Sequence, residues 1–206
     1  MAFFLSKSSH SDIVQMNLKE LKFLIASDLC RHAGKKSLAC LIRMIFSEPG
    51  FEYTFWMRIC AFCDAGRVRR WLLYPWARII LRHYTYKYGI SIPHQTRIGS
   101  GFYIGHFGQI FVNRRAVIGK NCNISQGVTV GQASRGHRKG WPTIGDNVYI
   151  APGAKIVGNV KIGNCVAIGA NCVVTTDIPD NGVVVGVPGK VISFEGSQGY
   201  VNHTDY

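Results

Sequence analysis

Aliphatic residues recur at every sixth position through the second half of the chain. An α-helix needs an apolar residue every 3.6 positions and a half-buried strand needs one every second position, so neither explains a sustained step of six. A stacked hexapeptide solenoid does. The step therefore predicts a parallel β-helix, with these residues inside it: Ile92, Ile98, Ile104, Ile110, Ile118, Ile124, Val130, Ile144, Ile150, Ile156, Ile162, Ile168 and Val174.

A second position, four residues after each aliphatic, supports the same register. It is occupied by small apolar residues, which fit inside a narrow prism, and glycine often follows the aliphatic itself, as corners with close backbone approach require. Three hexads form one coil, so we expect about five coils, with Ile144 stacked on Ile162 about 4.8 Å away. The small residues are Cys122, Val128, Val148, Ala154, Val160, Val166 and Cys172.

Two interruptions break the period. The step from Ile110 to Ile118 is eight, which we assign to two extra residues around 112–115, and the step from Val130 to Ile144 is fourteen. The longer one predicts an ejected loop, "GQASRGHRKGWPT". A tolerated insertion is the alternative, but loops on rigid scaffolds often carry function, and we expect this one to face a ligand or a subunit. Its basic and aromatic residues are Arg135, His137, Arg138, Lys139 and Trp141.

Residues 1–90 contain no hexads and show helical spacing instead. We expect three to four helices in "SDIVQMNLKELKFLIASDLCRH", "GKKSLACLIRMIF", "FEYTFWMRICAFCDAG" and "RVRRWLLYPWARIILRHYTYKYG". Ser11 or Asp12 is the expected first N-cap, Pro75 the expected kink and Gly89 the final cap. The fold class is thus α+β, with a helical domain at 1–90, a β-helix domain at 91–192 and a tail at 193–206.

The chain is basic, with a formal net charge of +13. Such an excess favours anionic partners. Arginines and aromatic residues interleave in the last helical segments, which suits an oligomer interface or, alternatively, peripheral contact with an anionic membrane. We expect no nucleic acid, because no recognised binding module accompanies the charge.

The seven cysteines are odd in number and lie mostly within apolar patterns. This predicts reduced, buried thiols in a cytoplasmic protein, at the inner face of the membrane if the basic helices bind lipid. Cys60 and Cys63 have CxxC spacing without a second pair, so we expect helical core there and no metal site. The opening "MAFFLS" is short and lacks basic residues, and no segment has the roughly 18 uncharged apolar residues of a membrane span.

Two motifs carry a family resemblance. "IGHFGQIFVNRRAVIGKNCNISQGVTVG" (104–131) and "IGANCVVTTDIPDNGVVVGVPGKVI" (168–192) resemble the left-handed β-helix acyltransferases, in particular the serine acetyltransferases and the related O-acetyltransferases of capsule and exopolysaccharide synthesis. The likeness covers about residues 85–195. It implies acetyl-CoA as donor, a homotrimer or dimer of trimers, and active sites between neighbouring prisms.

The resemblance also implies roles for residues at the matching positions. His106 corresponds to the general base, and imidazole is the side chain whose pKa suits that role near neutrality. His137 is a second candidate acid or base. Thr176 departs from a lysine that relatives often have, and a threonine offers no cation to a CoA phosphate. The implied donor-binding residues, with Gly131 as a candidate oxyanion donor, are Gly131, Ala151, Pro152, Ala170, Thr175, Thr176 and Lys190.

The acceptor positions depart from the serine acetyltransferase pattern. Relatives usually have aspartate where this chain has Ser91 and Gly105, and an Arg-His pair where it has Gly140 and Trp141. We therefore expect transfer to a sugar hydroxyl of a capsular polysaccharide, exopolysaccharide or precursor. Serine acetylation in cysteine synthesis is the alternative, and a non-catalytic glycan-binding trimer is a second. The expected acceptor-binding residues are Arg135, Arg138, Lys139 and Trp141.

Overall fold

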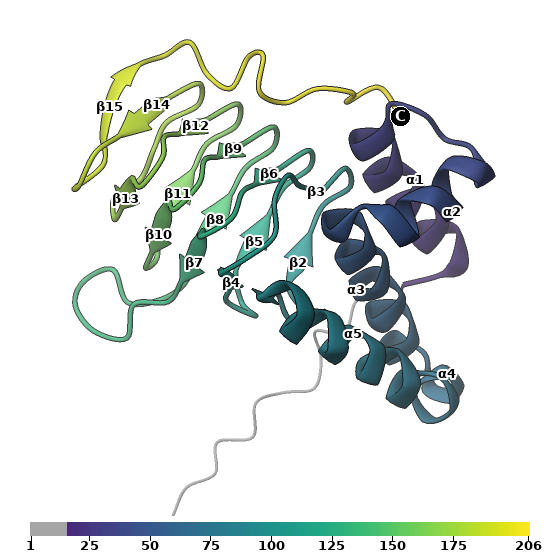
Figure 1. The fold of residues 1–206 in the computed structure, drawn as a ribbon. Coiled ribbons are helices and arrows are strands. Elements are labelled where there is room, and N and C mark those ends of the chain that lie inside the picture. Colours follow the sequence, from purple (N-terminus) through teal and green to yellow (C-terminus); the bar gives the residue numbers. More distant parts are fainter. Residues whose placement is uncertain (1–15) are drawn as a thin grey trace, which may run out of the picture.

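The computed structural model describes residues 16–206, which form a group of helices followed by a parallel β-helix built from three sheets (Figure 1). The predicted fold class is confirmed. Within these residues there are five helices rather than the three to four expected: α1 (Leu18–Ala33), α2 (Leu38–Ser47), α3 (Pro49–Ala65), α4 (Arg67–Leu72) and α5 (Tyr74–Tyr88).

Local sequence explains where these helices begin and end. Asn17 caps α1 and forms a capping box with Glu20, so the cap is not Ser11 or Asp12, both of which lie outside the described residues. The expected fourth helix is interrupted at Leu73, because Pro75 belongs to the first turn of a new helix rather than to a kink. Gly89 adopts φ of 61° and ends α5 as expected.

The strands form three sheets, one for each side of the prism. Sheet A contains β1 (Ile90–Ser91), β4 (Ile110–Val112), β7 (Thr129–Gly131), β10 (Lys155–Val157) and β13 (Val173–Val174). Sheet B contains β2 (Arg97–Ile98), β5 (Val117–Ile118), β8 (Thr143–Ile144) and β11 (Lys161–Ile162). Sheet C contains β3 (Tyr103–Ile104), β6 (Asn123–Ile124), β9 (Tyr149–Ile150), β12 (Ala167–Ile168), β14 (Val183–Val185) and β15 (Lys190–Ser193).

The core is a set of aliphatic columns that run along the prism. Ile144 pairs with Ile162 as predicted, and the small residues at the second position are fully buried. Together the columns define five coils. The column on the side of sheet A is Ile92, Val112, Val130, Ile156 and Val174; on the side of sheet B it is Ile98, Ile118, Ile144, Ile162 and Ile178; and on the side of sheet C it is Ile104, Ile124, Ile150, Ile168 and Val184. Ile92 directly follows β1, and Ile178 joins Ile162 through an isolated bridge.

The predicted place of the two-residue insertion was wrong. Val112, not Ile110, pairs with Val130, so the extra residues lie at the corner 105–109 instead of around 112–115. Ile110 and Val112 are two positions apart in one strand and are both buried, so each fits the aliphatic pattern equally well. The expanded corner contains His106.

A column of glycines lines the corner between sheets B and C. A methyl group on Gly145 would lie 2.7 Å from the carbonyl oxygen of Gly163, and one on Gly99 would lie 2.7 Å from the carbonyl carbon of Gly119. Here glycine is required by close approach of successive coils rather than by unusual φ.

The helices close the first end of the prism. Tyr53 exchanges two 3.1 Å hydrogen bonds with the backbone of Ile92, and Arg58 donates to the carbonyl oxygens of Ile98 and Gly99. Asp28, which pairs with Arg58 at 3.0 Å, accepts from the amide of Phe102. Side chains of α1 and α3 thus bind backbone groups that have no preceding coil.

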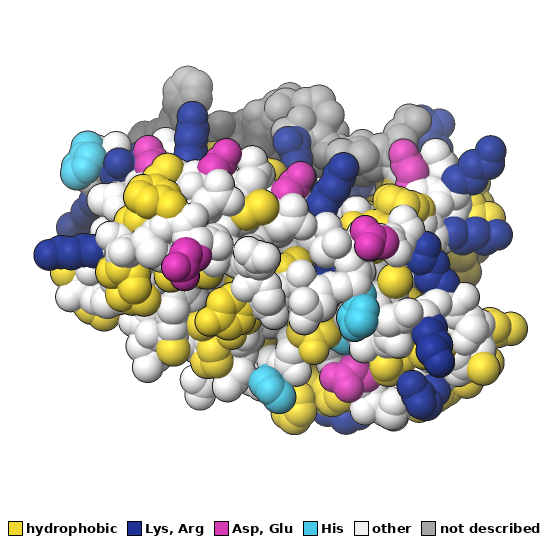
Figure 2. All heavy atoms as spheres, turned by 90° about the horizontal axis from the view of Figure 1, so that it is seen from above, with side chains coloured by type: hydrophobic (Ala, Val, Ile, Leu, Met, Phe, Trp, Pro, Cys, Tyr) yellow, Lys and Arg dark blue, Asp and Glu magenta, His cyan; other side chains and the backbone are white. Residues whose placement is uncertain are grey.

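The other end is closed by β15, which pairs with β14 in the antiparallel sense. The chain then returns along sheet C to α1 (Figure 1). There the Tyr206 hydroxyl lies 2.8 Å from the Ser100 hydroxyl and donates a 2.8 Å hydrogen bond to the amide oxygen of Asn121. Seen from the side that this segment crosses, acidic side chains are spread among basic and hydrophobic ones (Figure 2).

Gly145→Ala is expected to lower the free energy of unfolding by about 2–4 kcal/mol, because the added methyl group forces two coils apart. Gly131→Ala is the matched control, since its methyl group would meet neighbours at 3.5 Å and 3.7 Å, and its effect should stay within about 1 kcal/mol. Urea unfolding followed by circular dichroism measures both. Equal losses would contradict the close-approach explanation.

His32 is expected to make stability fall in acid. Its ring packs 4.4 Å from that of Tyr103, and its buried Nε2 has no hydrogen-bond partner within the described chain. Burial, with a smaller contribution from Arg31, lowers the pKa of His32 to about 3. The unfolded state then binds more protons below about pH 6.5, so the free energy of unfolding should drop by about 2–3 kcal/mol between pH 7 and 4.5.

His32→Phe keeps the ring and removes the titration. Its unfolding free energy should fall less over the same pH range, as measured by urea titrations at each pH. An unchanged pH slope would rule out His32 as the cause.

Candidate active site

His106 lies on the expanded corner between sheets C and A. The segment leaves β3 after Ile104 and re-enters at β4, with Gly108 at φ of 107° and Gln109 at φ of 53°. The His106 side chain is exposed, and it makes no hydrogen bond or ion pair within residues 16–206. Both ring nitrogens are therefore accessible to a bound hydroxyl group.

The corner is held from both sides. Gly127 donates a 2.8 Å hydrogen bond to the carbonyl oxygen of Gly108, and Ile110 donates a 3.1 Å bond to that of Gly89, the cap of α5. One neighbour is the next coil and the other is a helix. The position of His106 is thus set jointly by the prism and by α5.

An aromatic cluster packs behind the corner. The Phe107 ring lies 5.4 Å from that of Tyr88, which stacks on Tyr84, and the Tyr88 hydroxyl donates to the buried carboxylate of Glu52. A hydrogen bond to Glu52, together with burial, raises the pKa of Tyr84 to about 12. Nothing in the sequence pattern identified this support, because its members are far apart in the chain.

The corner between sheets C and A, which carries His106, recurs in each of the following coils. Ile104, Ile124, Ile150 and Ile168 form one column. At the end of the corner the hydrogen bonds align Gly108 with Gln126, Pro152 and Ala170, at about 4.8 Å per coil, so His106 lies in the two-residue expansion just before this position. Of the expected donor-binding residues, Ala151, Pro152 and Ala170 lie on this edge with His106, and Lys190 follows the same corner in the last coil.

The remaining expected residues lie on the opposite edge of sheet A. Gly131 is the last residue of β7, and Thr175 and Thr176 follow β13, at the corner between sheets A and B where the loop also emerges. About six residues of strand and corner separate the two edges, which corresponds to as much as 20 Å. Within one chain, the expected site residues therefore form two groups rather than one site.

The ejected loop is held to its own prism. Ala133 and Gly140 form an antiparallel bridge, and Arg138 pairs with Asp177 at 2.6 Å and donates to the carbonyl oxygen of Asn159. The Arg138 guanidinium is thus already engaged, although we expected it to bind the acceptor. The Arg115 guanidinium lies 4.9 Å from the ring centre of Trp141, and the side chains that remain exposed are Arg135, His137, Lys139 and Trp141.

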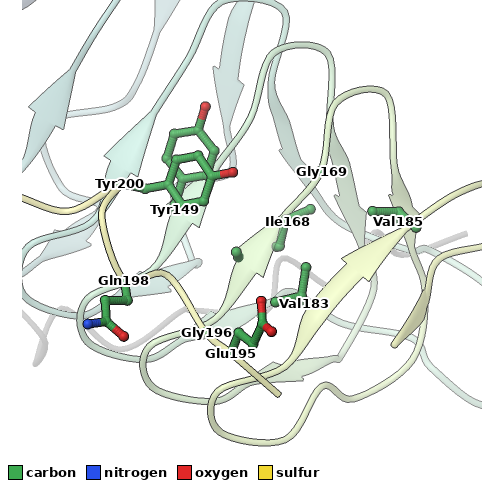
Figure 3. A pocket seen from close by; sticks show the side chains of 10 residues that line it. Tyr149, Ile168, Gly169, Val183, Val185, Glu195, Gly196, Gln198 and Tyr200 are labelled. Atoms are coloured by element: carbon green, nitrogen blue, oxygen red, sulfur yellow. The ribbon is translucent and has the colours of Figure 1, made fainter. Parts of the chain in front are cut away.

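A pocket of about 680 Å³, which sequence reasoning did not identify, lies between sheet C and the returning C-terminal segment. Figure 3 shows Tyr149 and Tyr200 stacked at one side of it, 4.4 Å apart, with Glu195 and Gln198 from the returning segment. Gly169, at its edge, directly precedes Ala170. The pocket therefore adjoins the edge that carries His106.

Comparison with known proteins agrees with this architecture. The family model "Bacterial transferase hexapeptide (six repeats)" matches residues 142–176. The serine acetyltransferase of Synechococcus elongatus is 37% identical over 155 residues, covering 73% of this chain and 60% of the relative. The solved structure of soybean serine acetyltransferase complexed with serine is 30% identical, covers 84% of this chain and 69% of its own, and has a TM-score of 0.68.

The chain belongs to the serine acetyltransferase family. The Neisseria gonorrhoeae family member, solved in complex with serine, is 29% identical with a TM-score of 0.69. The chain spans about 60% of the length of the curated family members that it matches first.

The positions that depart from the family pattern have distinct surroundings. A methyl group on Gly105 would lie 3.2 Å from the Tyr103 ring, so a larger residue there would have to displace that ring. Ser91 is half-buried in β1, at the first end of sheet A. Within residues 16–206 all seven cysteines are free, and no cluster of three or more His, Cys, Asp or Glu could hold a metal ion.

Proposed function

We propose that the chain is an acetyl-CoA-dependent O-acetyltransferase that transfers acetyl directly, with His106 as general base. The observation that carries this proposal is the exposed imidazole on an expanded corner, with neither ring nitrogen engaged. It shares an edge with Ala151, Pro152 and Ala170. Membership of the serine acetyltransferase family supports the same reaction class.

In this mechanism His106 accepts the proton of the acceptor hydroxyl as its oxygen attacks the thioester carbonyl. The new C–O bond forms, the C–S bond then breaks, and the protonated imidazole returns its proton to the CoA sulfur. No acyl-enzyme is required, because positioning both substrates next to the base suffices. A backbone N–H must stabilise the oxyanion, and Gly131 is our candidate.

The two edges of sheet A support a site shared between copies. His106 lies on one edge, while Gly131, Thr175, Thr176 and the loop lie on the other. A neighbouring prism can bring the second edge against the first, whereas a single rigid prism keeps them apart. We therefore propose a homotrimer, or a dimer of trimers, with donor and acceptor bound between subunits.

The edge that carries Ala151, Pro152 and Ala170, which we call the donor edge, suits CoA in shape. Ala151, Pro152 and Ala170 are small side chains that allow an extended pantetheine chain to approach the backbone. Lys190 is exposed in the last coil, where a cation can bind CoA phosphates. The free thiols suit the cytoplasm, where acetyl-CoA is made, and we propose that location.

The acceptor has two candidates. The curated family members are serine acetyltransferases, and this favours L-serine as the first acceptor to test. A specific feature of this chain favours a sugar hydroxyl as the second. No carboxylate stands at Ser91 or Gly105 to bind an ammonium group, and the loop offers exposed Trp141, a side chain suited to stacking on a sugar ring.

His106→Ala is expected to lower kcat by about 100-fold or more while CoA binding persists, because only the general base is lost. The assay is thiol release from acetyl-CoA with L-serine or with de-O-acetylated polysaccharide as acceptor, and calorimetry measures CoA binding. His137→Ala tests the second candidate acid or base in the same assays. Equal losses in both variants would assign His137 a role as well, and unchanged turnover in His106→Ala would exclude the base assignment.

The same assay decides between acceptors. Turnover with L-serine alone would establish serine acetylation and exclude the sugar, and turnover with the polysaccharide alone would do the reverse. If the wild-type protein binds no CoA, the catalytic proposal fails in favour of a glycan-binding assembly.

Two inactive variants are expected to restore each other's activity. One is His106→Ala, and the other replaces residues 134–139 with two glycines, leaving the bridge between Ala133 and Gly140. In randomly mixed oligomers, about one quarter of the interfaces combine an intact His106 edge with an intact loop. Co-expressed variants should recover thiol release toward about one quarter of the wild-type rate. Variants that are assembled separately and then combined should not recover it. No recovery on co-expression would contradict a shared site.

A further inference from the structure

The net positive charge of this chain arises from one part of the sequence. Between Asp64 and Asp146 there is no aspartate or glutamate, while the same stretch contains 13 lysines and arginines. The rest of the chain has 11 basic and 11 acidic residues, so this stretch accounts for the whole net charge of +13. It begins with α4 and α5, which together contain six basic residues and no acidic one.

The same two helices expose large apolar side chains. Trp71 is 82% exposed and Trp76 is 70% exposed, values that are unusual for tryptophan. We call this surface the α4–α5 face. It is made of Val68, Trp71, Leu72, Leu73, Trp76, Ile79 and Tyr86, all exposed.

The face points away from the rest of the molecule. On α5, Ala77, Leu81 and Tyr88 are buried against the core, and the exposed residues Trp76, Ile79 and Tyr86 recur at helical intervals on the other side. Figure 1 shows α5 along the outside of the helical group, below α3, with α4 next to the first turn of α5. The apolar stripe is thus available to an external partner.

Exposed arginines accompany the stripe. Arg67, Arg78 and Arg82 are all exposed, and the guanidinium of Arg82 lies 5.6 Å from the ring centre of Tyr86. Tryptophan and arginine beside aliphatic residues, on short helices, are typical of segments that lie in a membrane interface. A second copy meeting this face symmetrically would set arginines against arginines, which opposes association. An anionic lipid surface instead complements the charge.

We propose that the α4–α5 face binds the protein peripherally to an anionic lipid bilayer, with the tryptophans inserted at headgroup depth and the arginines against lipid phosphates. No helix in residues 16–206 is long and apolar enough to cross a membrane, so contact takes place at the surface. Tyr88, in the last turn of α5, packs on Phe107 next to His106. Binding through this helix places the proposed active site close to the lipid surface.

The test is flotation of the full-length protein with vesicles of phosphatidylcholine containing 30% phosphatidylglycerol, compared with pure phosphatidylcholine. We expect binding only to the anionic vesicles, weakening with added salt. Arg67→Gln/Arg78→Gln/Arg82→Gln should reduce the partition coefficient by about 100-fold, since each cation contributes to attraction at the surface. Trp71→Ser/Trp76→Ser should reduce it by about tenfold or more.

Matched controls come from α2 and the turn before it, where Lys35, Lys36 and Arg43 are exposed cations and Leu38 and Phe46 are exposed apolar residues. Lys35→Gln/Lys36→Gln/Arg43→Gln and Leu38→Ser/Phe46→Ser should bind vesicles as the wild type does. Equal losses in the controls would overturn the assignment to this face. So would failure of the wild type to bind anionic vesicles, and if the tryptophan variant then also changed the oligomeric state in sedimentation, a second copy would be the partner.

The vesicle test does not depend on the proposed catalysis. A protein that binds vesicles but lacks acetyl transfer would retain this inference and lose the function, and the reverse result would do the opposite.

Discussion

Every coil of this β-helix satisfies its backbone through the coil above and the coil below, so the first coil has an edge that nothing in the repeat can bind. A solenoid therefore needs a cap of different structure. Here Tyr53, Arg58 and Asp28 reach from the helices to the backbone at Ile92, Ile98 and Phe102. These side chains are buried and charged or polar, and their burial is compensated because they replace the missing coil. The helices are thus a structural part of the prism.

The repeat made most of the prism predictable. A step of six over this many aliphatic residues, with small residues at a second position, left little freedom in register, and the column from Ile144 to Ile162 is as expected. The insertion was misplaced because Ile110 and Val112 both point inward and either can continue the period. Only pairing with the neighbouring coil distinguishes them, and pairing is a property of the folded chain.

The candidate site was less predictable than the fold for a related reason. Motifs identified His106 and the residues near Pro152 and Thr175, but a motif does not say on which edge of a prism a residue lies. Position within the coil does, and it separates Pro152 from Thr175 by the width of sheet A. The contacts behind His106 connect Glu52, Tyr88 and Phe107, which are too far apart in sequence to form a pattern.

These contacts make α5 the element that connects two otherwise separate regions. Its cap, Gly89, accepts the hydrogen bond that returns the His106 corner to β4, and Tyr88 packs on Phe107 in that corner. Its outer side carries Trp76 and Ile79. A force applied to the outer side of a rigid helix is transmitted to both contacts, because packed interiors do not deform smoothly. The exposed side of α5, where we propose the lipid contact, therefore belongs to the same helix that holds the segment carrying His106.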